Sequence, residues 1–116
     1  APFDGEESIT LYADLEAGIS GSMSSALLPE KIAPVIDHFW NNEKDKAEEV
    51  YNGILPLINF ENRQCGFRAT KTVMKEGGVI KSDFCRDPIK PLDIDTKNLL
   101  LNFAKRYDLL TYKWGK

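Results

Sequence analysis

A run of small residues, GISGSMSSA at positions 18–26, constrains the fold of this chain more than any other segment. Glycine and serine are poor material for an exposed helix, and glycine inside a strand marks a close approach of neighbouring backbone. We therefore expect a buried strand here, between amphipathic helices. Because its backbone donors and acceptors need partners on both sides, the segment predicts an α/β protein with a parallel sheet whose other strands precede it.

Apolar stripes at helical spacing surround that strand. Gly18 is expected to cap the first helix in the left-handed conformation, and Gly77 and Gly78 are expected to end the fourth. Pro34 should kink the second helix or shift its start. Residues 78–92 contain two prolines and predict an extended connector. The expected helices are 8–17, 28–40, 45–58, 62–76 and a last one capped by Asp93 or Asp95, with Leu99, Leu100, Phe103 and Tyr107 on its apolar face.

Composition and charge exclude several classes of protein. A content of 42% hydrophobic and 28% charged residues is typical of a globular domain. The net charge of -3 provides no basic surface for nucleic acid. Apolar runs are too short for a membrane span, and residues 1–7 do not resemble a signal peptide. Cys65 and Cys85 lack the spacing of a zinc site or disulfide framework, so we expect no metal and a cytoplasmic protein.

Short motifs follow one another in a distinctive order along the whole chain. Gly5, Glu6 and Glu7 open the first helix, LPL lies at 55–57, Lys71 falls in the fourth helix, and RDPIKPL occupies 86–92. Together these motifs resemble the C-terminal portion of the dihydrodipicolinate synthase and N-acetylneuraminate lyase family. Within it, ENRQCG at 61–66 and KWGK at 113–116 look most like 2-keto-3-deoxy sugar-acid dehydratases.

The resemblance implies a (β/α)8 TIM barrel, which usually takes about 250 residues, so half or more of such a barrel would lie outside this chain. Residues 1–43 would supply the end of the seventh strand, the seventh helix, the eighth strand and the eighth helix. Residues 44–116 would form a C-terminal helical extension. The chain itself is expected to be mostly α-helical.

In this family a lysine on the sixth strand forms an imine with the 2-keto group of the substrate. A tyrosine on the fifth strand relays protons. Neither position falls inside this sequence, so the chain alone is expected to be inactive. Lys71 and Lys75 are expected on outer helices as solvated charges. The resemblance implies no metal or organic cofactor, a small-molecule 2-keto acid as substrate, the remainder of the barrel as partner, and a homo-oligomer, commonly a tetramer.

Barrel enzymes build their sites at the C-terminal ends of the strands. By resemblance, Gly5, Glu6 and Glu7 would follow the seventh strand and face substrate hydroxyls. The eighth strand would be followed by Met23, Ser24 and Ser25. Each substrate-binding role has a structural alternative. Glu6 and Glu7 could simply favour the positive end of a helix dipole, and the small residues 18–26 could simply permit close packing of strand and helix.

Other candidate residues favour structural roles. His38 is expected at the edge of the core or on the surface, and Cys65 is expected to be a small buried hydrophobe rather than a nucleophile. Two rival functions stay open. One is a pyruvate-dependent aldolase or synthase of the same family, and the other is a self-contained helical module that binds another protein through Trp40 or Trp114.

Overall fold

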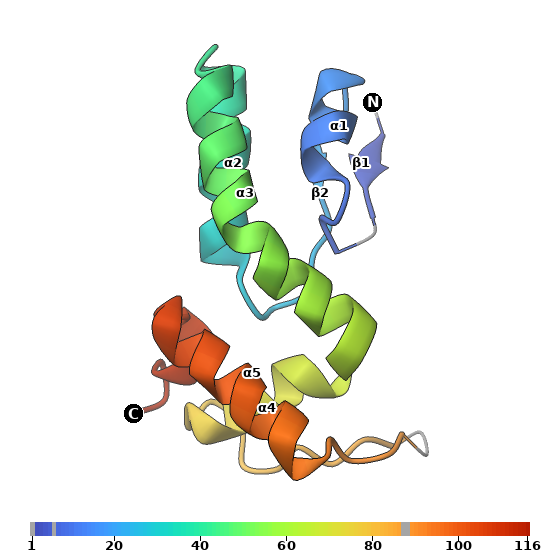
Figure 1. Cartoon of the computed structure of the whole chain (residues 1–116), viewed down its shortest axis with the longest axis vertical. Helices are drawn as coiled ribbons and strands as arrows, with labels where there is room; N and C mark the ends of the chain where they lie inside the picture. Colours follow the sequence, from blue (N-terminus) through green and yellow to red (C-terminus); the bar gives the residue numbers. More distant parts are fainter. Residues whose placement is uncertain (1, 6, 87–88) are drawn as a thin grey trace. The chain divides into compact units, whose positions relative to one another are not determined.

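The computed structural model describes residues 2–5, 7–86 and 89–116. Glu6, expected to face substrate, lies outside the described residues, as do two positions of the connector, 87 and 88. The chain divides into two compact units, Ala1–Asn59 and Phe60–Lys116 (Figure 1). The first unit contains both strands, and the second is helical among its described residues.

The first unit begins with two short parallel strands separated by a helix. Strand β1, Phe3–Asp4, pairs with β2, Gly21–Ser22, and helix α1, Leu11–Glu16, connects them. The backbone N–H of Ser20 donates to the carbonyl of Pro2 at 2.9 Å, and that of Met23 donates to Asp4 at 2.8 Å. A strand within 18–26 is therefore confirmed, but it is only two residues long.

The first helix starts later than the sequence predicted. Glu7 and Ser8 have φ of 52° and 71°, so the chain passes through the left-handed region where an α-helix cannot continue. The expected start at Ser8 was therefore wrong, and α1 begins at Leu11. The expected left-handed cap is confirmed, because Gly18 has φ of 96° directly after the helix ends.

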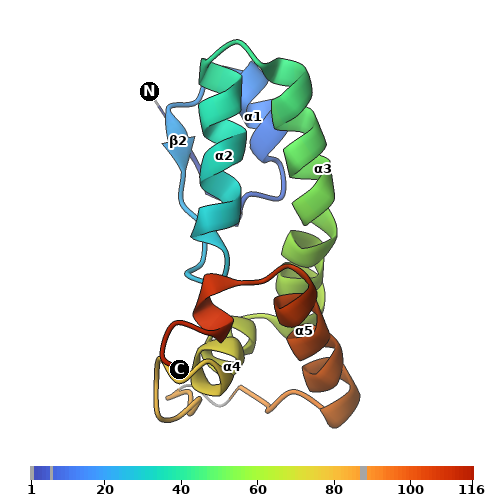
Figure 2. The ribbon, with the colours of Figure 1, turned by 90° about the vertical axis from the view of Figure 1, so that its left-hand side faces the viewer.

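Two longer helices complete the first unit. Helix α2 is Pro29–Trp40 and helix α3 is Lys44–Phe60; Figure 2 shows them joined by a tight turn. Pro34 does not shift the start of α2, because Pro29 already occupies its first turn. The ring of Tyr12 in α1 lies 6.0 Å from that of Phe39 in α2 and 6.3 Å from that of Tyr51 in α3. Through these aromatic contacts, α1 packs against both α2 and α3.

In the second unit the expected helix 62–76 is broken. Residues Glu61–Cys65 form a π-helical turn, η1, and Gly66 then adopts φ of 64° with ψ of -149°. A left-handed residue ends a helix, so α4 is only Arg68–Glu76. It is followed by α5, Ile94–Arg106, and a 3₁₀ turn, η2, Leu110–Tyr112.

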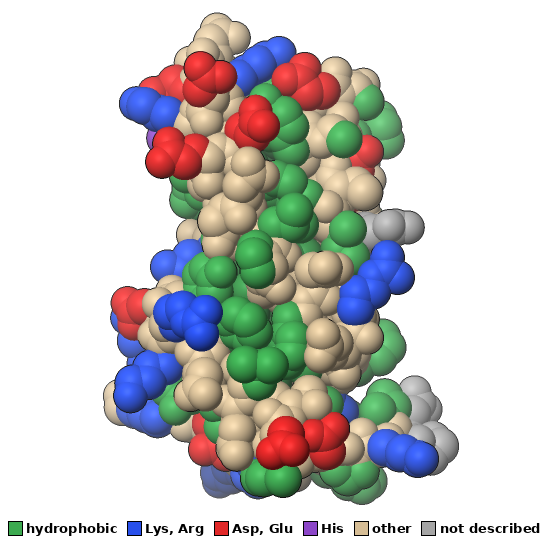
Figure 3. Space-filling model, in the orientation of Figure 1, with side chains coloured by type: hydrophobic (Ala, Val, Ile, Leu, Met, Phe, Trp, Pro, Cys, Tyr) green, Lys and Arg blue, Asp and Glu red, His purple; other side chains and the backbone are tan. Residues whose placement is uncertain are grey.

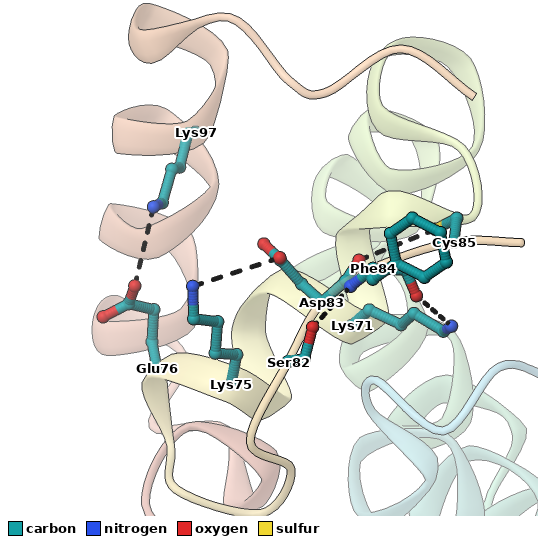
Figure 4. A network of polar contacts seen from close by, with 8 residues as sticks. All are labelled: Lys71, Lys75, Glu76, Ser82, Asp83, Phe84, Cys85 and Lys97. Carbon is teal, nitrogen blue, oxygen red and sulfur yellow. Dashed lines mark hydrogen bonds and ion pairs between the residues drawn. The ribbon is translucent and has the colours of Figure 1, made fainter. Parts of the chain in front are cut away.

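The extended connector before α5 is confirmed among its described residues, and α4 holds it in place (Figure 4). Lys71 Nζ donates to the Phe84 carbonyl at 2.8 Å, and Lys75 Nζ lies 4.0 Å from the Asp83 carboxylate. Lys71 and Lys75 are both exposed, as expected for residues on an outer helix face. These lysines therefore serve the local fold.

Large apolar side chains reach the surface of both units, and Figure 3 shows part of this apolar surface in green. Leu99 was expected in the apolar face of the last helix but is 42% exposed, whereas its neighbour Leu100 is buried. The other exposed large hydrophobic residues are Phe3, Met23 and Trp40 in the first unit and Phe67, Phe84, Ile94, Leu110 and Trp114 in the second.

Asp93, rather than Asp95, is the N-cap residue of α5. Its Oδ1 accepts from the Thr96 backbone N–H at 2.8 Å, and its Oδ2 accepts from the Thr96 hydroxyl at 2.9 Å. The Thr96 backbone bond, followed by its hydroxyl bond, lowers the pKa of Asp93 from the ordinary 3.8.

We expect Asp93→Ala to lower the midpoint of urea unfolding at neutral pH, because it leaves the first N–H groups of α5 without their acceptor. A lowered carboxyl pKa means that this stabilisation is present above 3.8 and is lost as the pH falls through the lowered pKa. The difference from wild type should therefore shrink in acid. Asp95→Ala, in the same turn, is the control; an equal loss there would contradict the capping role.

Candidate functional site

A cluster of polar side chains lies at the carboxyl ends of β1 and β2. Because the strands are parallel and Asp4 pairs with Ser22, the residues after each strand leave the sheet at the same edge. Asp4 is only 5% exposed, and the Ser22 hydroxyl donates to its Oδ2 at 3.1 Å. The hydroxyl oxygens of Ser8 and Ser22 are 2.6 Å apart. We call Asp4, Ser8 and Ser22 the strand-end cluster.

Two further polar groups adjoin the strand-end cluster. The Thr10 hydroxyl donates to the Asp14 carboxylate at 2.7 Å and lies 3.4 Å from Asp4 Oδ1. Burial raises the pKa of Asp4 above the ordinary 3.8, and the nearby Asp14 carboxyl raises it further, while the Ser22 and Thr10 hydroxyls lower it. The cluster is therefore a buried carboxyl group supported by hydroxyl donors.

The structure brings the described residues that were expected to face substrate to this edge. Gly5 follows β1 directly, Glu7 lies in the turn after it, and Met23 follows β2 directly. Glu7 is half-buried; its Oε2 has no hydrogen-bond partner among the described residues. Contact of these residues with substrate stays a prediction.

The two serines expected beside Met23 have local backbone contacts. The Ser24 hydroxyl donates to the Ser25 carbonyl at 3.3 Å, and Ser25 Oγ accepts from the Leu27 N–H at 3.3 Å. The Ser25 contact helps turn the chain from β2 towards α2, which supports a structural role for that hydroxyl. A substrate contact of either serine is an additional prediction.

No local sequence pattern indicated the strand-end cluster. Ser8 was placed in a helix, and Ser22 was treated as one of several small packing residues. Asp4 carried the one available signal, since it directly precedes Gly5 where the seventh strand was expected to end. The contacts that unite these residues span 14 and 18 positions along the chain, which a local pattern does not show.

His38 and Cys65 have the structural roles that the sequence predicted for them. His38 is half-buried, with its Nδ1 3.2 Å from Glu43 Oε1 at the turn between α2 and α3. Cys65 is buried, and burial, with smaller effects from Glu61 and Asp93, raises the pKa of its thiol to about 11. A thiol with this pKa is almost entirely protonated at neutral pH and is a poor nucleophile.

We therefore expect Cys65 to resist iodoacetamide at pH 8 in the folded protein, with alkylation measured by mass spectrometry. A Cys85→Ser background isolates its signal, and unfolding in urea should make Cys65 fully reactive. Labelling of the folded protein at the rate seen in urea would contradict a buried, protonated thiol.

The described ranges contain no helix that is long and apolar enough to cross a membrane. Within those ranges, there is also no group of three or more histidine, cysteine, aspartate or glutamate side chains arranged to hold a metal ion.

A strand–helix–strand–helix unit with parallel strands and polar residues at their carboxyl ends defines an α/β protein built from β/α repeats. Residues 2–106 match the model of the Dihydrodipicolinate synthetase family, and the chain belongs to that family.

Two comparisons support this assignment. The chain is 45% identical over 114 residues to the L-2-keto-3-deoxyarabonate dehydratase of Azospirillum brasilense, a match that covers 98% of this chain and 37% of that protein. Its fold is similar to the crystal structure of dihydrodipicolinate synthase from Rhodopseudomonas palustris, with a TM-score of 0.77 and 24% identity over 88% of this chain and 34% of that one. The resemblance seen in the sequence is confirmed, and the chain spans little more than a third of either relative.

Proposed function

We propose that this chain is the C-terminal portion of a (β/α)8 lyase that dehydrates a 2-keto-3-deoxy sugar acid, with L-2-keto-3-deoxyarabonate as the first candidate substrate. The observation that carries the proposal is the 45% identity to a dehydratase of that name across 98% of the chain. In this proposal β1 and β2 are the ends of the seventh and eighth barrel strands, and α1 and α2 are the helices that follow them.

The proposed reaction runs through an imine between a lysine elsewhere in the barrel and the 2-keto group of the substrate. A protonated C=N bond is a better electron sink than a ketone, so it stabilises the carbanion that forms beside it and permits loss of water. This chemistry requires neither a metal nor an organic cofactor. The chain's contribution is the wall of the pocket.

Within that wall, the residues after β1 and β2 would recognise the hydroxyl-bearing part of the substrate. Carboxylates accept hydrogen bonds from hydroxyl groups, and Glu7 offers a buried oxygen that has no other hydrogen-bond partner among the described residues. Gly5 and Glu6 before it, and Met23, Ser24 and Ser25 after β2, would complete this wall. We also propose a cytoplasmic enzyme that assembles as a homo-oligomer.

The proposal is tested with a hybrid enzyme, in which this chain replaces the matched segment of the Azospirillum brasilense dehydratase. We expect the hybrid to consume L-2-keto-3-deoxyarabonate with loss of water and with its five-carbon skeleton intact, so that no pyruvate is released. The unaltered dehydratase is the positive control. Release of pyruvate by carbon–carbon cleavage would favour the aldolase alternative, and a folded hybrid that shows neither reaction would contradict the proposal.

The remaining alternative, a self-contained helical interaction module, has less support. It would leave β1 and β2 as an isolated pair of two-residue strands, and such a pair is not stable by itself in water. The family match across residues 2–106 also has no explanation in that alternative.

A further inference from the structure

We propose that Asp4 is a positioning residue for the recognition of substrate hydroxyls: its buried carboxylate holds Ser22 and, through Ser22, holds Ser8 in the turn that carries Glu7. The inference rests on the proposed function and deepens it. Asp4 itself does not need to touch the substrate.

The hydrogen bonds of the strand-end cluster have a defined direction. The single hydroxyl proton of Ser22 is donated to Asp4 Oδ2 at 3.1 Å. When Ser22 donates to an ionised Asp4, the contact of 2.6 Å between the hydroxyls of Ser8 and Ser22 uses the proton of Ser8, with Ser22 Oγ as its acceptor. The chain of donors therefore runs from Ser8 to Ser22 to Asp4, and only Asp4 can end it, because a carboxylate accepts without donating.

This chain of hydrogen bonds begins at Ser8, which lies in a backbone turn that needs support. Glu7 and Ser8 both adopt positive φ, at 52° and 71°, which non-glycine residues adopt only where surrounding contacts hold them. The Glu7 N–H donates to the Gly5 carbonyl at 2.7 Å, and the Ser8 side chain is fully buried against Ser22. Asp4 thus supports the backbone that directly follows Glu7, because it holds Ser8 through Ser22.

Glu7 is the residue that this support would serve. It follows β1 at the carboxyl edge, and its buried Oε2 has no hydrogen-bond partner among the described residues. A buried acceptor of this kind is normally satisfied by a donor, and a polyhydroxylated substrate carries donors that pyruvate lacks. The arrangement therefore predicts that loss of Asp4 impairs recognition of the hydroxylated substrate and spares imine formation with pyruvate.

The test compares Asp4→Ala and Asp4→Asn in the hybrid enzyme. Asp4→Ala removes the acceptor of Ser22 and should raise KM for L-2-keto-3-deoxyarabonate about tenfold or more, with a smaller change in kcat. Asp4→Asn keeps an oxygen that can accept from Ser22, so its KM should stay within about threefold of the parent. Borohydride trapping with pyruvate should proceed at the parent rate in both variants. Asp37→Ala, which removes an exposed carboxylate of α2, is the control and should change neither quantity.

The outcomes separate positioning from a general role in the fold. An unchanged KM in Asp4→Ala, or a parallel fall of turnover and pyruvate trapping, would overturn the inference. Absence of trapping in the parent hybrid would instead count against the proposed function. A crystal structure of the Asp4→Ala hybrid tests the inference without a measurement of activity. The contact between Ser8 and Ser22 should open, and the φ of Glu7 should no longer be positive. Retention of both features would overturn the inference.

Discussion

Gly77→Ala is expected to destabilise the C-terminal unit by about 3 kcal/mol, although it adds only one methyl group. An alanine Cβ at this position would lie 2.0 Å from the Thr111 carbonyl oxygen and 2.6 Å from the Tyr112 carbonyl carbon. Both atoms belong to backbone, so no side-chain rotation relieves the overlap. The Gly77 φ of -79° is acceptable to alanine, and the effect is therefore one of space rather than of conformation.

Gly53→Ala is the matched control for this prediction. Gly53 lies in the interior of α3 and is exposed, and an alanine Cβ there would meet no atom of a neighbouring element within 4 Å. The same substitution there should stabilise the helix by about 0.5–1 kcal/mol, because alanine loses less conformational entropy than glycine. Urea unfolding of the two variants measures both effects. A Gly77→Ala variant as stable as wild type would contradict the close backbone approach.

The second large effect concerns covalent labelling with pyruvate and borohydride. We expect the hybrid enzyme to be labelled completely and this chain by itself to take up no label. An imine-forming lysine must be desolvated or otherwise activated. Three lysines of this chain do not meet this requirement. Lys71 and Lys75 are exposed and contact the connector before α5. Glu43 raises the pKa of Lys46, which disfavours its neutral, nucleophilic amine.

Peptide mapping of the labelled hybrid gives the decisive detail of that experiment. The modified lysine should lie in the part contributed by the Azospirillum brasilense dehydratase. Substitution of Lys71 by arginine is the control and should leave labelling unchanged. A modified lysine within this chain would contradict the proposal that the imine forms elsewhere in the barrel.

Local patterns predicted much of the fold because they report local physics. The apolar stripe of α2 placed that helix within a residue or so, and the glycines after α1 and α4 placed the C-terminal ends of those two helices. Parallel pairing was expected because a short buried strand needs neighbours, and β1 supplies one of them. The order of strand, helix, strand and helix in the first unit followed from the same argument.

The errors arose where distant contacts override local preference. Ser8 has an ordinary position for a helix start, but its contact with Ser22 holds it in the left-handed region. The π-helical turn before Gly66 likewise had no signal in the apolar pattern. The strand-end cluster was missed for the same reason, since its donors and acceptor meet only after β1 and β2 have paired.

We propose that this chain completes a barrel whose other strands belong to the rest of the full-length protein. The most direct test is to coexpress the chain with the Azospirillum brasilense dehydratase from which the matched segment has been deleted, and to measure assembly by sedimentation together with dehydratase activity. We expect a stable complex of the two pieces and recovery of activity that neither piece has alone. Two soluble, folded pieces that sediment separately and remain inactive would contradict it.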